Sequence, residues 1–219
     1  MRQNPERRAA LTDAAIRVLG RAGARGLTYR SVEAEAEVPP GTASNYFRNR
    51  TDLLRQVAHR IHERARPSED QLRQLASAPP SHQRIVELLQ ATRRRVLDDR
   101  DLHLALLELR LEATRHQPLR APLTATVRAD MAANFAFHRA AGLPGDTGDL
   151  LLLHLALTGL LLEQLTLPDT LGGADADALI AELVDRLVPA AEPRAAAGGS
   201  ARTIPTPPIN SAAHSPRQG

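Results

Sequence analysis

The chain lacks cysteine and lysine, and only five of its 219 residues are aromatic. Without a thiol it forms no disulfide and no cysteine-ligated metal site, and it offers no thiol nucleophile. Leucine dominates the aliphatic residues, with 34 leucines against 15 isoleucines and valines together, and this balance favours helices over strands. The composition therefore predicts one or two helical domains and excludes a disulfide scaffold and thiol-based redox chemistry.

Long apolar segments are also scarce. The N-terminal residues are charged and lack the apolar stretch of a secretory signal, so we expect a cytoplasmic protein. The most apolar run, residues 150–162, has 13 residues, whereas a membrane span needs about 20. We therefore expect no membrane partner and predict that this run forms a helix buried by protein on all sides.

Charge is distributed unevenly along the chain. All 28 basic residues are arginine; residues 1–66 carry a net charge of +6, and the remaining residues carry −3. A basic N-terminal third indicates a module that binds a polyanion. Charge alone is compatible with both nucleic acid and anionic lipid.

Capping residues and hydrophobic periodicity predict helices throughout the first 188 residues. Asn4 and Pro5 indicate the start of a first helix that Gly23 ends, and Thr28 indicates the N-cap of a second. Short connections between the later helices are typical of a bundle. The predicted helices after the first span residues 28–36, 40–46, 51 onward, 68–77, 81–98, 101–116, 122–141, 147–166 and 175–188.

Residues 28–54 read TYRSVEAEAEVPPGTASNYFRNRTDLL, two short helices joined by a tight turn, which is the pattern of a helix-turn-helix. Such a motif lays its second helix in the major groove and places neighbouring helix ends against phosphates. The second helix carries small, polar residues that suit base edges and phosphate oxygens, namely Gly41, Thr42, Ala43, Ser44 and Asn45. The alternative is a helical hairpin buried in a bundle that never contacts DNA.

This stretch resembles the DNA-binding domain of the TetR family of transcriptional repressors over about residues 8–56. Two positions depart from the family pattern: Glu37 stands where a turn glycine is common, and Glu33 where a small residue is common. Glu37 costs about 1 kcal/mol if the turn needs a positive φ there. The resemblance is carried by Leu27-Thr28, Val38, Gly41-Thr42, Tyr46-Phe47, and Arg50 just before Leu53-Leu54.

The resemblance implies a role in DNA binding for particular residues. Those at the start of the second helix, with Tyr46 and Arg50, would bind phosphates, those of the third helix would face the groove, and Phe47 would belong to the core. The implied DNA-binding set is Thr28, Arg30, Gly41, Thr42, Ser44, Asn45, Tyr46 and Arg50.

The fold class we predict is all-α, with an N-terminal three-helix DNA-binding domain followed by a helical bundle. The predicted domains are a helix-turn-helix domain over residues 1–50, an effector-binding and dimerisation domain over 51–189, and a disordered tail over 190–219. The tail is rich in Ala, Gly, Pro and Ser and cannot offset its ordering entropy. The apolar last two helices are expected to pair with those of a second chain.

Polar residues set within apolar stripes are candidates for an effector pocket. They are His103, Asn134, His138, His154 and Thr158. The alternative for each is a satisfied polar group of the core or of the dimer interface. We expect no cofactor and no metal, because His59 and His62 share a helix without a third ligand.

Together these features predict a transcriptional regulator, a ligand-responsive repressor that binds a palindromic operator as a homodimer. Activation instead of repression stays open. The first alternative is a helical protein that binds a small molecule or a partner and whose DNA head is vestigial. The second is a helical enzyme, which only the scattered histidines suggest, so no enzyme is predicted.

Overall fold

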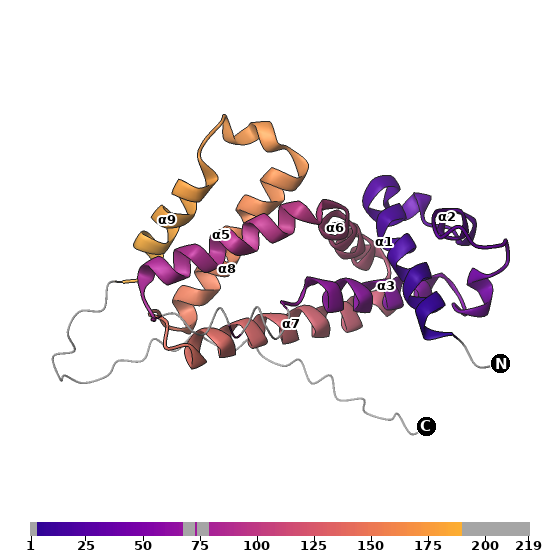
Figure 1. The fold of residues 1–219 in the computed structure, drawn as a ribbon, viewed down its shortest axis with the longest axis horizontal. Helices are drawn as coiled ribbons and strands as arrows, with labels where there is room; N and C mark the ends of the chain where they lie inside the picture. The colour runs from indigo at the N-terminus through magenta and orange to yellow at the C-terminus, as the bar shows by residue number, and fades with distance from the viewer. Residues whose placement is uncertain (1–3, 68–72, 74–78, 190–219) are drawn as a thin grey trace, which may run out of the picture.

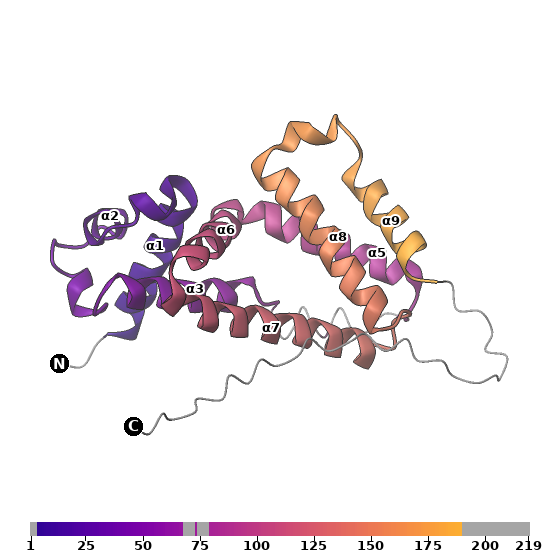
Figure 2. The ribbon, with the colours of Figure 1, turned by 180° about the vertical axis from the view of Figure 1, so that it is seen from behind.

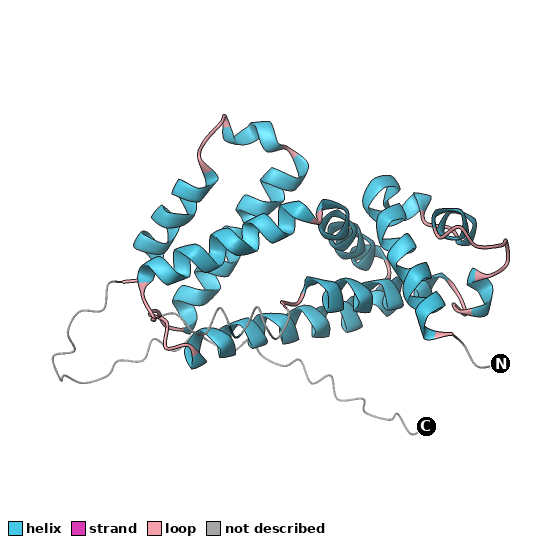
Figure 3. Ribbon diagram, in the orientation of Figure 1, coloured by secondary structure: helices cyan, strands magenta, loops and turns pink. Residues whose placement is uncertain are grey.

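The structure, a computed structural model, describes residues 4–67, 73 and 79–189. These residues form eight α-helices and two short 3-10 helices without a strand (Figure 3). The predicted all-α class is therefore confirmed. The helix predicted over 68–77 and the tail over 190–219 lie outside the described residues, apart from residue 73.

The helices form a head at one end of an elongated molecule and a bundle at the other (Figure 1). The head contains α1 (Pro5–Gly26), α2 (Tyr29–Glu35), the 3-10 helix η1 (Ala43–Asn45) and the start of α3 (Arg50–Ala65). The remaining helices are α5 (His82–Asp98), α6 (Arg100–Arg115), α7 (Gln117–Ala140), α8 (Thr147–Thr166), η2 (Pro168–Leu171) and α9 (Ala176–Leu187).

Local signals set most helix starts. Asn4 caps α1 by accepting hydrogen bonds from two backbone N–H groups, and Thr28 caps α2, as the sequence predicts. The main difference is α7, which begins at Gln117 and not at residue 122. Pro118 favours a helix start because its missing N–H is not needed there, and Pro122 forfeits one bond in the second turn.

Two separate apolar clusters hold the molecule together. The first joins the head to α6 and the start of α7, and its fully buried members include Leu19, Phe47 and Leu109. The second joins α5, α8 and α9 through residues such as Leu157 and Ile180. Figure 2 shows the second group, with α8 crossing in front of α5, away from the head. The head therefore shares its core with α6 and not with α5, α8 or α9.

Helix α8 is the one described helix that is long and apolar enough to cross a membrane. One side of it packs in the second cluster through Leu153, Leu157 and Leu160. Its other side is open, because Leu152 is 50% exposed and Leu155 is 58% exposed. The prediction of a helix buried on all sides is therefore wrong for the single chain, since α5 and α9 cover only one face.

Candidate nucleic-acid interface

The start of α2 is organised by a reciprocal capping box. The Thr28 hydroxyl accepts a hydrogen bond from the Ser31 N–H at 3.0 Å, and the Ser31 hydroxyl accepts one from the Thr28 N–H at 2.9 Å. Thr28 and Arg30 are both exposed at this helix end. Two of the four residues predicted to bind phosphate, Thr28 and Arg30, thus stand on a fixed, accessible helix N-terminus.

The turn after α2 has a positive φ at Glu37, the position where the sequence departs from a common turn glycine. Glu37 has φ 53°, in the left-handed region that glycine adopts most readily. The turn is closed by two backbone hydrogen bonds, from Glu37 N–H to Ala34 O and from Val38 N–H to Glu33 O. A glutamate at this position therefore stores strain of about 1 kcal/mol.

The helix predicted to face the DNA groove is shorter than the sequence suggests. It is the single 3-10 turn η1, residues 43–45, and not a helix over 40–46. The Ser44 hydroxyl donates to Gly41 O at 2.8 Å, and the Thr42 hydroxyl donates to Pro39 O. Such side-chain bonds compete with the backbone ladder of a helix, which explains the difference.

A buried carboxylate anchors η1 from below. Glu33 is 6% exposed, and its Oε1 accepts a hydrogen bond from the Ala43 N–H at 2.7 Å. In the sequence Glu33 stands out only as a departure from the family pattern. Its contact with η1 could have been inferred only from its position on the inner side of α2. Glu33 therefore holds the start of the candidate recognition helix against α2.

The predicted groove-facing residues are accessible. Gly41, Ser44 and Asn45 are exposed and Thr42 is partly exposed, whereas Ala43 and Phe47 are buried. The backbone of Gly41 has φ 86°, and a Cβ added there would meet no atom within 4 Å. Glycine is thus required at this position by its backbone conformation and not by crowding within the chain.

The two tyrosines of the head differ in their availability. The Tyr29 hydroxyl donates to Phe47 O at 2.9 Å, and burial, with the nearby charge of Asp52, raises the pKa of Tyr29. Tyr46 is partly buried beneath the guanidinium of Arg8, which lies 5.9 Å from the ring centroid. Only Tyr46 keeps its hydroxyl free of hydrogen bonds to other described residues.

Arg50 has partners that its sequence position did not reveal. Its guanidinium donates to Leu27 O and to Ala24 O, each at 2.6 Å, and lies 3.9 Å from the carboxylate of Glu112 on α6. It thereby caps the end of α1 and connects it to α6. Its assignment as a phosphate contact stays a prediction, and 46% of its side chain is exposed.

Further polar contacts join α1 to α6. The Ala24 N–H donates to the Glu108 carboxylate at 3.0 Å, and Arg21 pairs with Asp101 at 2.9 Å. Gly23, which interrupts α1 with φ 67°, turns the chain toward Glu108. No local sequence pattern indicates this junction, because its residues are about 80 positions apart.

The five effector candidates are not gathered in one place. His138 is buried, its Nε2 lies 2.8 Å from Pro144 O, and burial lowers its pKa. Asn134 shares the helical face of Leu123 but is exposed, so the prediction that it points into a packed interior is wrong. The described helices that pack on α7, namely α3 and α6, cover its N-terminal part.

The other three candidates lie on α6 and α8. Burial lowers the pKa of His103, whose Nδ1 lies 3.0 Å from Asp99 O. Burial and the charge of Arg110 lower the pKa of His154, and its side chain has no hydrogen bond to another described residue. Thr158 donates to the backbone of His154 at 2.7 Å. Of these three, His154 is thus the group most available to a ligand.

The architecture and the exposed turn define a helix-turn-helix transcriptional regulator with a separate helical domain. Residues 11–57 match the family model of "Bacterial regulatory proteins, tetR family", and residues 80–190 match that of "Tetracyclin repressor-like, C-terminal domain". The chain belongs to the TetR family. Proteins of this family are generally not enzymes.

Solved structures agree with this assignment. The multidrug binding protein EbrR complexed with imidazole is 27% identical, with a TM-score of 0.61 over 87% of this chain and 99% of that one. A TetR-family member from Streptomyces coelicolor A3 is 28% identical, with a TM-score of 0.64 over 85% of this chain and 100% of that one. Salmonella enterica GusR is 18% identical with a TM-score of 0.60 over 85% and 98% of the two chains, a likeness of fold alone. A comparison with curated proteins gave no match.

Proposed function

We propose that this regulator is a ligand-responsive repressor that binds a near-palindromic DNA operator as a homodimer in the cytoplasm. The observation that carries the proposal is the exposed turn of Gly41, Ser44 and Asn45, held by Glu33 on the most basic part of the chain. A small polar surface of this kind enters a major groove without steric conflict.

Within this proposal the residues of the head have different roles in DNA binding. Asn45 and Ser44 read base edges, with Gly41 and Thr42 bringing the backbone close to the duplex. Thr28, Arg30 and Tyr46 bind phosphates, and Arg50 adds its charge from the position where it caps α1. Because arginine–phosphate pairs supply much of the affinity, binding should weaken steeply as salt is raised.

The open face of α8 supports the homodimer. Leu152, Leu155, Gly159 and Leu162 follow one another at spacings of three, four and three residues, the pattern of a helix–helix seam. The three leucines are 42% to 58% exposed, and a Cβ added at Gly159 would meet no atom within 4 Å. A second copy of the same helix, approaching closely at the glycine, would bury this stripe about a two-fold axis.

The proposed domain boundaries follow from these roles: residues 1–50 bind DNA, and residues 51–189 bind the effector and the second subunit. A second EbrR structure, complexed with ethidium and 28% identical to this chain, supports an effector site in the helical domain. We assign it to the surroundings of His154 on α8, a half-buried side chain without a hydrogen bond to another described residue.

The effector would act on the distance between the two heads. Two half-sites must lie about 34 Å apart or a multiple of that, so a dimer with another head spacing loses specific affinity. A hundredfold release of DNA needs about 2.7 kcal/mol of coupling, within the usual allosteric range.

Recovery of protein-bound DNA fragments from the source genome tests the proposal. We expect an inverted repeat in the recovered fragments and tight binding of it in a gel-shift assay. Asn45→Ala should change the preference at one position of each half-site, whereas Tyr46→Phe should weaken binding to all sequences alike. Recovery of no enriched sequence would favour the alternative of a ligand-binding protein with a vestigial head.

A further inference from the structure

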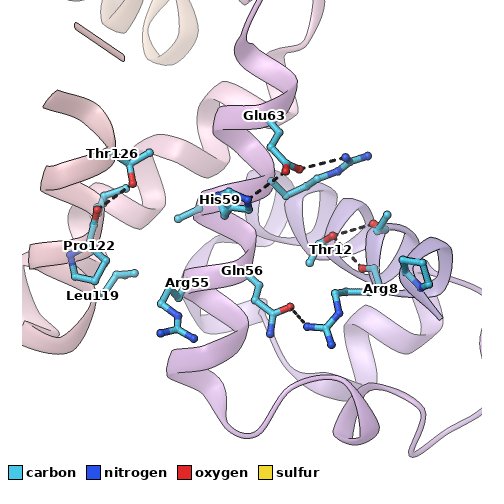
Figure 4. A pocket seen from close by; sticks show the side chains of 14 residues that line it. Arg8, Thr12, Arg55, Gln56, His59, Glu63, Leu119, Pro122 and Thr126 are labelled. Carbon is cyan, nitrogen blue, oxygen red and sulfur yellow. Dashed lines mark hydrogen bonds and ion pairs between the residues drawn. The ribbon is translucent and has the colours of Figure 1, made fainter. Parts of the chain in front are cut away.

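A groove of about 510 Å³ runs between α1, α3 and α7 (Figure 4). This volume is within the range of small-molecule sites. Leu119 and Leu123 of α7 and Ala58 of α3 form an apolar floor, and Pro122 forms part of the wall beside α7. None of the five effector candidates lines it. The groove can therefore hold the apolar body of a small molecule at the junction of the head and the helical domain.

One end of the groove is rich in hydrogen-bond donors. The Arg8 guanidinium donates to Gln56 Oε1 at 2.8 Å and has no carboxylate partner among the described residues. Arg55 is nearby on α3 (Figure 4); it pairs with Asp52 at 3.2 Å, and 64% of its side chain is exposed. Both guanidinium groups retain N–H donors that can bind an anion.

The other end carries no available negative charge. Glu63, the one carboxylate among the described residues that line the groove, is held by His59 at 3.1 Å and by Arg60 at 3.5 Å. Arg60 is itself fixed by two hydrogen bonds of 2.9 Å to Asp13. Among the described residues, the groove thus offers a cation no unpaired carboxylate, whereas the Arg8 guanidinium, which has no carboxylate partner, keeps N–H donors for an anion.

We propose that this groove binds a small amphipathic anion, a carboxylate with a medium-length aliphatic body. The carboxylate lies between Arg8 and Arg55, and the body lies along Leu119, Pro122 and Leu123. A molecule in this place contacts α1 and α3 on one side and α7 on the other, so it ties the head to the helical domain. It also draws Arg8 away from the ring of Tyr46.

The absence of tryptophan from the sequence permits a direct binding test. His59→Trp places a single tryptophan at the groove, at a side chain that is 76% exposed, so the fold should tolerate it, and Arg60 still pairs with Glu63 in this variant. Titration with decanoate is expected to change its fluorescence saturably. The cation decyltrimethylammonium and neutral decanol should bind at least tenfold more weakly. Arg128→Trp, on the exposed part of α7 outside the groove, serves as the control reporter and should not respond.

Further variants test where the carboxylate and the aliphatic chain of decanoate bind. In the His59→Trp protein, Arg8→Gln and Arg55→Gln together should weaken decanoate binding at least tenfold. Thr126→Phe should also weaken it, because the larger side chain narrows the groove without a change of charge. Arg128→Gln, the matched loss of an arginine, should change it less than twofold. Equal binding of decyltrimethylammonium and decanoate would overturn the proposal, as would unchanged binding in both the double arginine variant and Thr126→Phe.

The proposal does not rest on the DNA function. Decanoate binding is measured on the free protein, and gel-shift assays measure operator binding independently, so failure of one is seen separately from failure of the other. If the two arginines serve only DNA, Arg8→Gln weakens DNA binding and leaves decanoate binding unchanged, which also counts against the groove.

Discussion

Glu33 and Ala43 are joined by a hydrogen bond of 2.7 Å between a buried carboxylate oxygen and a backbone N–H. The bond links the inner side of α2 to the first residue of η1, across the turn that contains the positive φ of Glu37. Since η1 is a single turn, it has few bonds of its own to maintain its conformation. The position of the exposed Ser44 and Asn45 therefore depends in part on this contact, together with the burial of Ala43 and Phe47 and the hydrogen bond from the Tyr29 hydroxyl to Phe47 O.

Glu33→Ala should lower the free energy of unfolding by about 1–3 kcal/mol, because it leaves the buried Ala43 N–H unsatisfied. Glu33→Gln, which keeps an acceptor oxygen, should cost less. Urea unfolding measures the free energy, and amide hydrogen exchange at Ala43 measures the local effect. Unchanged protection of the Ala43 amide in Glu33→Ala would contradict the role given to this carboxylate.

Glu37→Gly should raise the free energy of unfolding by about 0.5–1 kcal/mol, because glycine relieves the strain of φ 53° at a moderate entropic cost. Glu37→Ala removes the same charge but keeps the strain, so it is the matched control and should give no gain. Thermal unfolding of the three proteins separates backbone strain from charge. A gain of the same size in both variants would assign the effect to charge.

Gly20→Ala should separate α1 from α6. A Cβ at Gly20 would lie 2.3 Å from the backbone oxygen of Asp101, which cannot move without shifting the start of α6. We expect a loss of about 1–3 kcal/mol in the free energy of unfolding, the usual cost of overpacking. Ala10→Gln, at an exposed position of the same helix, should be close to neutral in the same urea titration. Equal stability of the two variants would show that α1 and α6 are not in close contact.

Leu155→Arg should yield monomers, because it places a charge in the middle of the proposed seam on α8. Leu157, although only two residues away, is buried in the core of its own chain, so Leu157→Arg should unfold the protein instead. Leu111→Arg is a control at a leucine that is 54% exposed on α6. Sedimentation velocity distinguishes the outcomes, and an intact dimer of Leu155→Arg would argue against this interface.

The free energy of unfolding should fall as the pH is lowered from 7.5 to 5.5. Burial lowers the pKa of His103, His138 and His154 in the folded state, so below their unfolded pKa of about 6.5 protons bind the unfolded chain preferentially. Their contribution is complete above pH 6.5 and is lost as the pH decreases.

The same urea titrations on His154→Gln should show a smaller loss over this range than those on the parent protein. The Asp13 carboxylate does not contribute to the loss in this pH range. Burial alone would raise the pKa of Asp13, but its hydrogen bonds to Arg60 and Arg64 lower the pKa overall, so it acts only in more acidic solution. Stability that stays constant from pH 7.5 to 5.5 would contradict the burial of these histidines.

The elements that local chemistry controls could be predicted from the sequence. Thr28 caps α2 with its own hydroxyl, and Asn4 with Pro5 begins α1, so their positions need no knowledge of distant residues. The length of η1 was missed because hydroxyl-to-carbonyl bonds from Thr42 and Ser44 replace helical ones. A periodicity of apolar residues does not report such competition.

The contacts that could not be predicted are those between distant segments. Arg50 is directed to the end of α1 and toward Glu112, a relationship across 62 positions that no local pattern shows. The two faces of α8 are equally apolar in sequence, so only the positions of α5 and α9 decide which leucines are buried. Asn134 lies on the same face of α7 as Leu123, as predicted. The sequence does not show that the neighbouring helices cover this face only near Leu123 and leave Asn134 exposed.

Asp99 is at once the C-cap of α5 and the N-cap of α6, so this residue marks one point at which the chain passes between the two apolar clusters. Helix α6, with 16 residues, is about 24 Å long, and the head packs against its side. By the same geometry, a rotation of about 10° at this joint would swing its far end through an arc of about 4 Å. A small change in packing beside α5 can therefore produce a larger displacement of the head that we propose binds DNA.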